Sequence, residues 1–341
     1  MDSVGATLEV TARERVEART DARPGPRRAT AVRILIRLLS ALGVLWGAVT
    51  LAFISVRLAP GDTVDVLLGE QQRTPEIEAA IRAEWGLDSP VIVQYLRYLG
   101  DSARGDFGRS YILQRPVSEI IASQAGPTAA LTVAALAVAL VFAVVVATTT
   151  ARRRRSRAIA NTVELTLVST PPFWLGIVLL SVSSFTLKIF PVAGNKGPEA
   201  LVLPALTLGL PLGAVVSQVL RDGLERALDE PFALTVKSWS VSETALRLRH
   251  GLRHAALPAV TLTGWLVGGL LGGAVIIEEV FGRPGLGRAT VDAVLAQDLP
   301  VVLAVAILSA LVYVVISTVV DLLYLWLDPR LRTAARQGRA R

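Results

Sequence analysis

Six long apolar runs, separated by polar segments of unequal length, dominate the pattern of this chain. Each run is long enough to cross a hydrocarbon core of roughly 30 Å as a helix that rises about 1.5 Å per residue. The pattern therefore predicts an all-α integral membrane protein with six transmembrane helices. The predicted spans cover residues 34–58, 128–150, 163–187, 201–220, 257–281 and 301–327.

The polar segments set the organisation around these spans. Residues 1–33 mix arginines with acids and show no recurring apolar face, which predicts a disordered cytoplasmic arm. The first span, 34–58, lacks the short basic start and cleavage site of a signal peptide, so we expect it to be retained. Residues 59–126 form an extracytoplasmic segment, residues 127–329 hold the other five spans, and residues 330–341 form a basic cytoplasmic tail.

The extracytoplasmic segment has the signals of short helices. Thr74 and Pro75 are typical of a helix start, and Gly86 is a natural stop. Apolar spacing predicts a second helix over 91–99, and Pro116 opens a third.

A polar segment, 232–258, separates the fourth and fifth spans and contains both histidines. It is too long for a turn, and it predicts two short helices that meet at a corner within residues 230–258. The first is expected over 231–239, since a proline is tolerated in a first turn. The second is expected to begin at Ser240, whose hydroxyl pairs with Glu243 in a capping box. Residues 232–258 are called the coupling segment below.

Composition and charge support a membrane protein. A mean hydropathy of +0.53 and 52% hydrophobic residues exceed what soluble domains usually carry. The net charge of +7 arises from arginines beside apolar runs, so membrane topology explains it better than nucleic-acid binding. Basic residues gather at 152–157, in the coupling segment and in the tail, which predicts that both termini and the coupling segment face the cytoplasm.

The sequence offers few groups for chemistry. It has no cysteine and no Gly-x-x-x-x-Gly-Lys-Ser/Thr loop for nucleotide phosphates. His250 and His254 are spaced to share a helix face and could hold a metal. Arg249 and Arg253 beside them would repel a cation, and no third ligand is evident, so we expect no bound metal and no cofactor in this chain.

Acids inside apolar runs are costly, about 2.5–3.5 kcal/mol each at the bilayer centre. Glu164, Glu278, Glu279 and Asp321 all lie where they can reach an interface or a buried partner. Structural pairing is therefore expected rather than a proton relay.

Two further features concern helix shape. Pro171 and Pro172 interrupt the third span, which predicts either a kink with a functional role or a plain irregularity of helix packing. The fifth span carries a small face that favours close helix packing, within the chain or against a partner subunit. Its glycines are Gly264, Gly268, Gly269, Gly272 and Gly273.

Several motifs together resemble one family. Residues 235–242 (T-V-K-S-W-S-V-S), followed by Arg249-His250 and 256–258 (A-L-P), resemble the cytoplasmic coupling loop, or EAA loop, of ABC importer permeases. The resemblance is to the B-type permease of dipeptide, oligopeptide and nickel importers. Ser240 replaces the usual glycine and Trp239 the usual lysine. The same family pattern is matched in order by L-A-P-G-D at 58–62, G-D-F-G-R-S at 105–110, R-P-V at 115–117 and F-G-R-P-G-L-G at 281–287.

This resemblance implies a type I ABC importer permease fold and a multi-pass subunit of the cell inner membrane. It implies a second homologous permease, two ATPase subunits that hold ATP and Mg, an extracytoplasmic solute-binding protein and surrounding lipid as partners. No nucleic acid is expected. The implied coupling residues are Phe232, Thr235, Lys237, Trp239, Ser240, Val241, Glu243, Arg249 and His250. The implied pathway or kink residues are Pro171, Pro172, Phe173 and Trp174, and the extracytoplasmic turn is formed by Pro284, Gly285 and Gly287.

The implied cargo is a di- or oligopeptide, with a nickel chelate, an opine or glutathione left open. Two other classes also remain open at this point: an ion-coupled transporter or channel, and a membrane sensor or scaffold. Trp239 either contacts an ATPase subunit or packs against this chain's own cytoplasmic helix ends.

Overall fold

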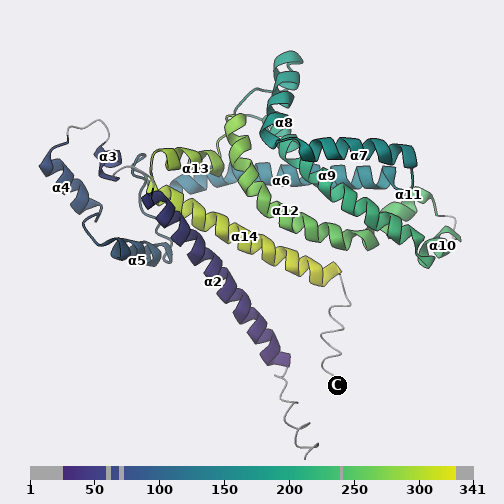
Figure 1. The fold of residues 1–341 in the computed structure, drawn as a ribbon, viewed down its shortest axis with the longest axis horizontal. Coiled ribbons are helices and arrows are strands. Elements are labelled where there is room, and N and C mark those ends of the chain that lie inside the picture. The colour runs from purple at the N-terminus through teal and green to yellow at the C-terminus, as the bar shows by residue number, and fades with distance from the viewer. Residues whose placement is uncertain (1–25, 59–62, 69–72, 239–240, 328–341) are drawn as a thin grey trace, which may run out of the picture. The chain divides into compact units, whose positions relative to one another are not determined.

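The computed structural model describes residues 26–58, 63–68, 73–238 and 241–327. Within these ranges every regular element is a helix, as predicted (Figure 1). The first half contains α2 (Pro26–Leu58), α3 (Thr63–Leu68), α4 (Pro75–Glu84), α5 (Val91–Ser102), α6 (Val117–Thr150) and α7 (Arg154–Ser169). The second half contains α8 (Pro172–Leu179), the π-helix η1 (Leu180–Thr186), α9 (Glu199–Asp229), α10 (Pro231–Ser238), α11 (Glu243–Ala245), the π-helix η2 (Leu246–Gly251), α12 (Leu252–Val280), α13 (Leu286–Leu295) and α14 (Leu299–Leu327).

Five helices in the described residues are long and apolar enough to cross a membrane. They cover Leu35–Ser55, Val117–Thr150, Glu199–Asp229, Glu243–Val280 and Leu299–Val320. These match five of the six predicted spans. A sixth is reached only if the pair Arg154–Ser169 and Pro172–Thr186 is counted as one broken span.

The predicted third span is not a single helix, because the chain bends by 106° between α7 and α8. Thr170 and Pro171 both adopt extended backbone, with ψ of 125° and 135°. A residue that precedes a proline is driven out of the helical region, and here two such residues are consecutive. The chain is therefore fully broken at Pro171 and Pro172, and the bend by itself does not distinguish a functional kink from a packing irregularity.

The helices expected within residues 59–126 follow their predicted signals, with one correction. Thr74 caps α4 by accepting a hydrogen bond from the backbone of Ile77 at 3.3 Å, and Gly86 adopts a positive φ of 63°. The expected third short helix is instead the first part of α6, which runs without interruption through Pro127 to Thr150.

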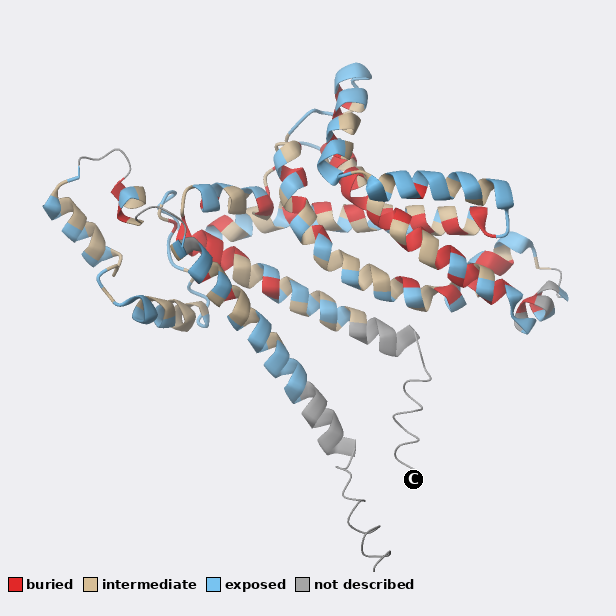
Figure 2. Ribbon diagram, in the orientation of Figure 1, coloured by how far each residue is buried: buried red, intermediate tan, exposed pale blue. Residues whose placement is uncertain are grey.

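The core lies where α9 crosses α6. Figure 2 shows α9 buried over most of its length, whereas α7 is largely exposed. On α6, every fourth residue in one stretch is a fully buried alanine: Ala135, Ala139, Ala143 and Ala147. A Cβ atom at Gly209 would come within 2.5 Å of the carbonyl oxygen of Ala135, so α9 needs glycine at this point. The two backbones therefore pack in direct contact, as small residues permit in membranes.

The glycines of the fifth span, now in α12, divide into two groups. Gly264 packs against Val320 and Gly268 against Tyr313, both on α14. At Gly269 and Gly272, no atom of the described chain lies within 4 Å of the place that a Cβ atom would occupy. Part of the predicted small face thus packs within the chain, and part of it is open.

Candidate functional site

The coupling segment contains two helical parts, but only the first is short: α10 ends at Ser238, whereas the second runs from Glu243 through η2 and α12 to Val280. Figure 1 shows α10 and α11 together beyond one end of α9. The second helix begins later than expected: Ser242, rather than Ser240, is its N-cap, and its hydroxyl accepts a hydrogen bond from the backbone of Ala245 at 3.3 Å. The run Ser-Val-Ser offers two hydroxyls for this role, and the helix uses the one next to Glu243.

Some predicted coupling residues lie outside what the structure describes. Trp239 and Ser240 fall between its ranges, and the side chains of Phe232 and Lys237 are likewise not described. Of the others, Thr235, Glu243 and Arg249 are exposed, whereas Val241 and His250 are half-buried.

The inner face of the coupling segment packs against the C-terminal ends of α6 and α9. Val236 and Leu246 are buried in one apolar cluster with Leu220 and Leu224 of α9, and Val241 packs against its edge. A Cβ atom at Gly251 would lie 2.5 Å from a methyl group of Leu224, so the segment closely approaches α9. The exposed coupling residues Thr235, Glu243 and Arg249 lie outside this cluster and form a polar outer face.

Arg247 fixes the corner to α6. Its guanidinium donates a hydrogen bond to the carbonyl oxygen of Thr148 at 3.1 Å and forms an ion pair with Glu243 at 3.0 Å. Thr148 lies in the last turn of α6, where carbonyl groups lack partners within the helix. A buried arginine thus completes the end of one membrane helix while holding the coupling segment in place.

The basic run that predicted the orientation also makes specific contacts with α9. Arg152 pairs with Asp229, and Arg157 pairs with Glu225 and, at 3.2 Å, with Asp222. These ion pairs attach the loop between α6 and α7 to the helix that leads into the coupling segment.

A buried ion pair joins α7 to α9, further from the coupling segment. The Arg221 guanidinium donates to both carboxylate oxygens of Glu164, at 2.7 and 2.9 Å. Ser217 donates to that carboxylate at 2.6 Å, and Asn161 accepts from Arg221 at 2.7 Å. The side chains of Arg221 and Glu164 are 2% and 1% exposed. The prediction that Glu164 finds a buried partner is confirmed, although the sequence did not identify that partner as Arg221.

The turn that contains Pro284, Gly285 and Gly287 is organised around a second buried acid, Glu278 of α12. Its carboxylate accepts hydrogen bonds from the Thr128 hydroxyl at 2.5 Å, the Gly287 backbone at 2.8 Å and the Arg288 backbone at 3.2 Å. The acid therefore caps the N-terminus of α13, where backbone N–H groups lack helical partners. Structural pairing is confirmed for Glu278, while exposed Glu279 lies 3.8 Å from Arg288.

Gly285 and Gly287 are required in this turn because the backbone passes very close to α12. A Cβ atom at Gly285 would lie within 2.3 Å of the Glu278 carboxylate, and one at Gly287 would lie 2.4 Å from the Cα atom of Val275. Arg283 is buried next to them and donates to the Ala200 carbonyl oxygen at 2.9 Å. Burial lowers the pKa of the Arg283 guanidinium, and the charge of Glu278 acts in the opposite direction.

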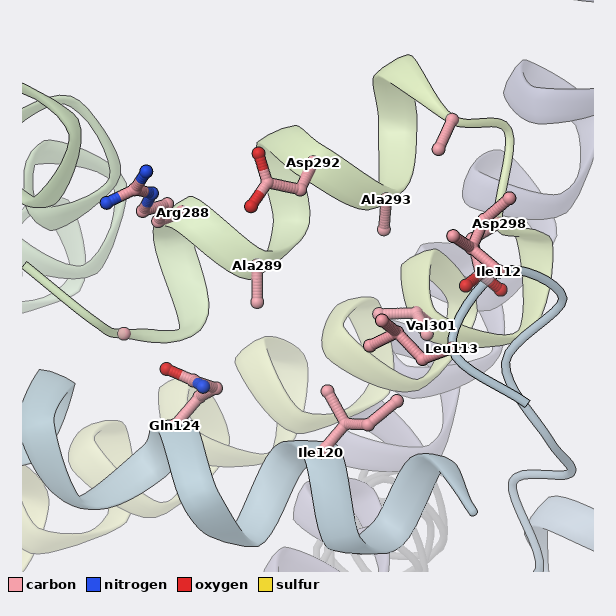
Figure 3. A pocket seen from close by; sticks show the side chains of 12 residues that line it. Ile112, Leu113, Ile120, Gln124, Arg288, Ala289, Asp292, Ala293, Asp298 and Val301 are labelled. Atoms are coloured by element: carbon pink, nitrogen blue, oxygen red, sulfur yellow. The ribbon is translucent and has the colours of Figure 1, made fainter. Parts of the chain in front are cut away.

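A cavity of about 420 Å³, which the sequence did not predict, opens beside this turn (Figure 3). Ala289 and Ala293 of α13 point toward Ile120 and Gln124 of α6 across it. Side chains from four parts of the chain line it, and only the completed fold brings them together. The others in the lining are Ile112, Leu113, Gly285, Arg288, Asp292, Ala296, Asp298 and Val301.

The residues at the broken span are not part of this cavity. Phe173 and Trp174 follow Pro172 in the first turn of α8, and both side chains are about half exposed. Gly176, one turn further, packs against Phe281. The break thus directs two exposed aromatic side chains away from the core of the described chain.

Comparison with known proteins identifies close relatives. Residues 139–333 match the model of the family described as "Binding-protein-dependent transport system inner membrane component". The glutathione transport system permease protein GsiC of Salmonella paratyphi A is 38% identical over 301 residues, which cover 88% of this chain and 98% of that protein. The protein of the same name from Escherichia coli is 36% identical over the same coverage. Among solved structures, an amino acid ABC transporter crystallised with histidines aligns with a TM-score of 0.47 and 16% identity, over 61% of this chain and 94% of that chain.

Proposed function

This chain belongs to the family of binding-protein-dependent transport system inner membrane components, and we propose that its coupling segment is where separate ATPase subunits act on it. As a permease subunit of an ABC importer, it is a multi-pass membrane protein and a component of a transporter rather than an enzyme. ATP and Mg are then held by the partner subunits. The arginine-rich loop, coupling segment and tail face the cytoplasm in this proposal.

One observation carries the coupling proposal: the helix that begins inside the coupling segment is continuous to the extracytoplasmic turn. It runs from Glu243 to Val280, 38 residues, or about 57 Å at the rise of an α-helix. Pro258 lies within it without breaking it. Closure of ATPase subunits on the coupling segment would therefore displace the same rigid element that holds Glu278 at the other side of the membrane.

The outer face of the coupling segment supplies the contacts for an ATPase groove. We propose Phe232 and Trp239 as the apolar anchors, each contributing on the order of 1.5–3 kcal/mol when fully buried. Val241 packs against the edge of the inner cluster and can add only the part of its side chain that stays exposed. The polar residues Thr235, Lys237, Ser240, Glu243, Arg249 and His250 surround these anchors in the sequence.

We expect Trp239→Ala to abolish ATP-driven uptake while expression and membrane insertion stay unchanged, because the variant removes the largest anchor without altering the spans. Uptake into vesicles that contain the assembled transporter, together with the amount of ATPase that co-purifies, measures this effect. Thr244→Ala, an exposed change in the same segment, is the control and should retain uptake. Normal uptake by the Trp239 variant would contradict the coupling role.

For the cargo, we propose a small peptide, with glutathione included. Relatives that are 36–38% identical over 98% of their length are named as glutathione transport permeases, and glutathione is itself a tripeptide. The same assembly of permease and ATPase subunits could import a nickel chelate or an opine, because the solute-binding protein delivers the cargo.

The cargo proposal is tested with the transporter reconstituted together with its own solute-binding protein. We expect glutathione or short peptides to stimulate ATP hydrolysis and to accumulate in the vesicles. Stimulation by a nickel chelate or an opine alone would overturn the peptide assignment while leaving the importer intact. Uptake that persists without the ATPase subunits would instead favour an ion-coupled transporter.

The open face of α12 supports a contact with the second permease subunit. Trp265 is 76% exposed and Ile276 is 49% exposed, and Gly269 and Gly272 lie between them at helical spacing. Two glycines between large apolar side chains allow another helix to approach closely. We place the partner permease against this face.

A further inference from the structure

Helix α5 has its apolar side facing away from the protein. Ile92 and Leu96 lie one turn apart and are 62% and 59% exposed, and Val93 beside them is 40% exposed. The opposite side of the helix, which packs against the chain, carries Gln94 and Tyr95. An amphipathic helix on a water-facing surface has the reverse arrangement, with its apolar stripe toward the core.

Polar contacts hold the inner side of α5 in place. The Gln94 amide donates to the carbonyl oxygens of Leu87 and Ser89, at 3.1 and 2.8 Å, and its carbonyl accepts from Arg57. The Tyr95 hydroxyl lies 2.6 Å from the Thr50 hydroxyl. These contacts orient the helix, so the outward apolar side is a fixed feature of the fold.

The contacts also set the depth of α5 relative to the membrane. Thr50 and Phe53 belong to the apolar span Leu35–Ser55, and the ring of Tyr95 is 5.3 Å from that of Phe53. Phe53 in turn packs with Leu299 and Leu303, at the start of the span Leu299–Val320. Helix α5 therefore rests on two transmembrane helices at the ends where they leave the hydrocarbon.

We propose that α5 lies in the interfacial region of the outer leaflet, with Ile92 and Leu96 among phospholipid acyl chains. Helices with one strong apolar face bind membranes in this way, with that face at the boundary between headgroups and acyl chains. Tyrosines are enriched at this level, which agrees with Tyr95 on the same helix. Arg97 lies at the edge of this apolar side, and its guanidinium lies beside Gly86.

Neighbouring residues of α2 favour lipid over a soluble protein as the occupant. Leu51 and Ile54 are 68% and 47% exposed and flank the contacts with α5. They belong to the transmembrane span itself, so the surface around them is in lipid at this depth. The outward side of α5 extends this apolar surface to the membrane boundary.

The absence of cysteine from the sequence makes the test direct. Ile92→Cys and Leu96→Cys are made separately, labelled with a bimane fluorophore and reconstituted as the assembled transporter in phosphatidylcholine–phosphatidylglycerol vesicles. Brominated phospholipid and aqueous iodide serve as quenchers. Leu42→Cys in the first span is the lipid control, and Glu84→Cys on α4 is the water control.

We expect brominated lipid to quench labels at 92 and 96 nearly as strongly as at 42, and iodide quenching to be at least about threefold weaker than at 84. Iodide quenching equal to that at 84 would place α5 in water and overturn the proposal. Protection of the labels from both quenchers would show that a protein subunit covers α5, and this result would also overturn the proposal. Because the two positions are tested independently, one variant that fails to assemble leaves the other decisive.

Discussion

Replacing Arg221 with alanine should destabilise the protein by about 3–5 kcal/mol, because the change leaves the Glu164 carboxylate buried without its cation. Both side chains are almost completely buried, and the pair joins α7 to α9. The Ser217 hydroxyl and Asn161 would remain, but neither carries the charge that the carboxylate requires. Reversible unfolding in mixed detergent micelles measures the change in the free energy of unfolding.

A double variant separates the cost of an unpaired charge from the value of the pair. Glu164→Leu combined with Arg221→Leu removes both charges, and such replacements are often neutral or stabilising by about 1–4 kcal/mol. Arg155→Ala, at an exposed position near the start of α7, should change stability by less than about 0.5 kcal/mol. A loss for Arg221→Ala no larger than that for Arg155→Ala would show that the buried pair does not hold α7 to α9.

The second large effect is expected for Gly287→Ala at the extracytoplasmic turn. The new methyl group would lie 2.4 Å from the Cα atom of Val275 and 2.9 Å from a carboxylate oxygen of Glu278. Backbone cannot rotate away as a side chain does, so α13 must shift and lose its cap from Glu278. Overpacking of this kind costs about 1–3 kcal/mol and occasionally more, and we expect the upper end.

Gly43→Ala is the control for this change. Gly43 lies inside α2, and no atom of the described residues is within 4 Å of the place that its Cβ atom would take. Alanine there should be neutral or stabilise the helix by up to about 1 kcal/mol. Thermal unfolding of the purified variants compares the two. Equal melting temperatures would mean that the contact between α12 and α13 tolerates an extra carbon atom.

Five of the six spans could be located from the sequence because length and apolarity alone decide them, whereas the third is present only as a broken pair of helices. The break at Pro171 was predictable as well, since two consecutive prolines act on local backbone geometry. The family motifs indicated the coupling segment and the glycine turn before any contact was known. The physical reason for Gly285 and Gly287 became visible only with Glu278 beside them.

Other parts of the site depend on tertiary contacts that no local pattern encodes. From the sequence, Arg221 is a basic residue just after a predicted span, and only the fold shows that it pairs with Glu164. The sequence also does not decide whether Ser240 or Ser242 caps the second helix, because both hydroxyls precede Glu243 and either could serve as the cap. The cavity beside α13 is lined from four separate parts of the chain, so its existence could not be predicted from any one of them.

The contact between α6 and α9 restricts how the permease can change shape. Gly209 and Gly213 lie against the carbonyl oxygens of Ala135 and Ala139, where a Cβ atom has no room. A one-turn slide would bring Ala205 against Ala135 in one direction and Ser217 against Ala139 in the other. The Glu164–Arg221 pair adds α7 to the same block. We therefore expect inward and outward openings to form at other helix contacts, with α6, α7 and α9 moving as one body.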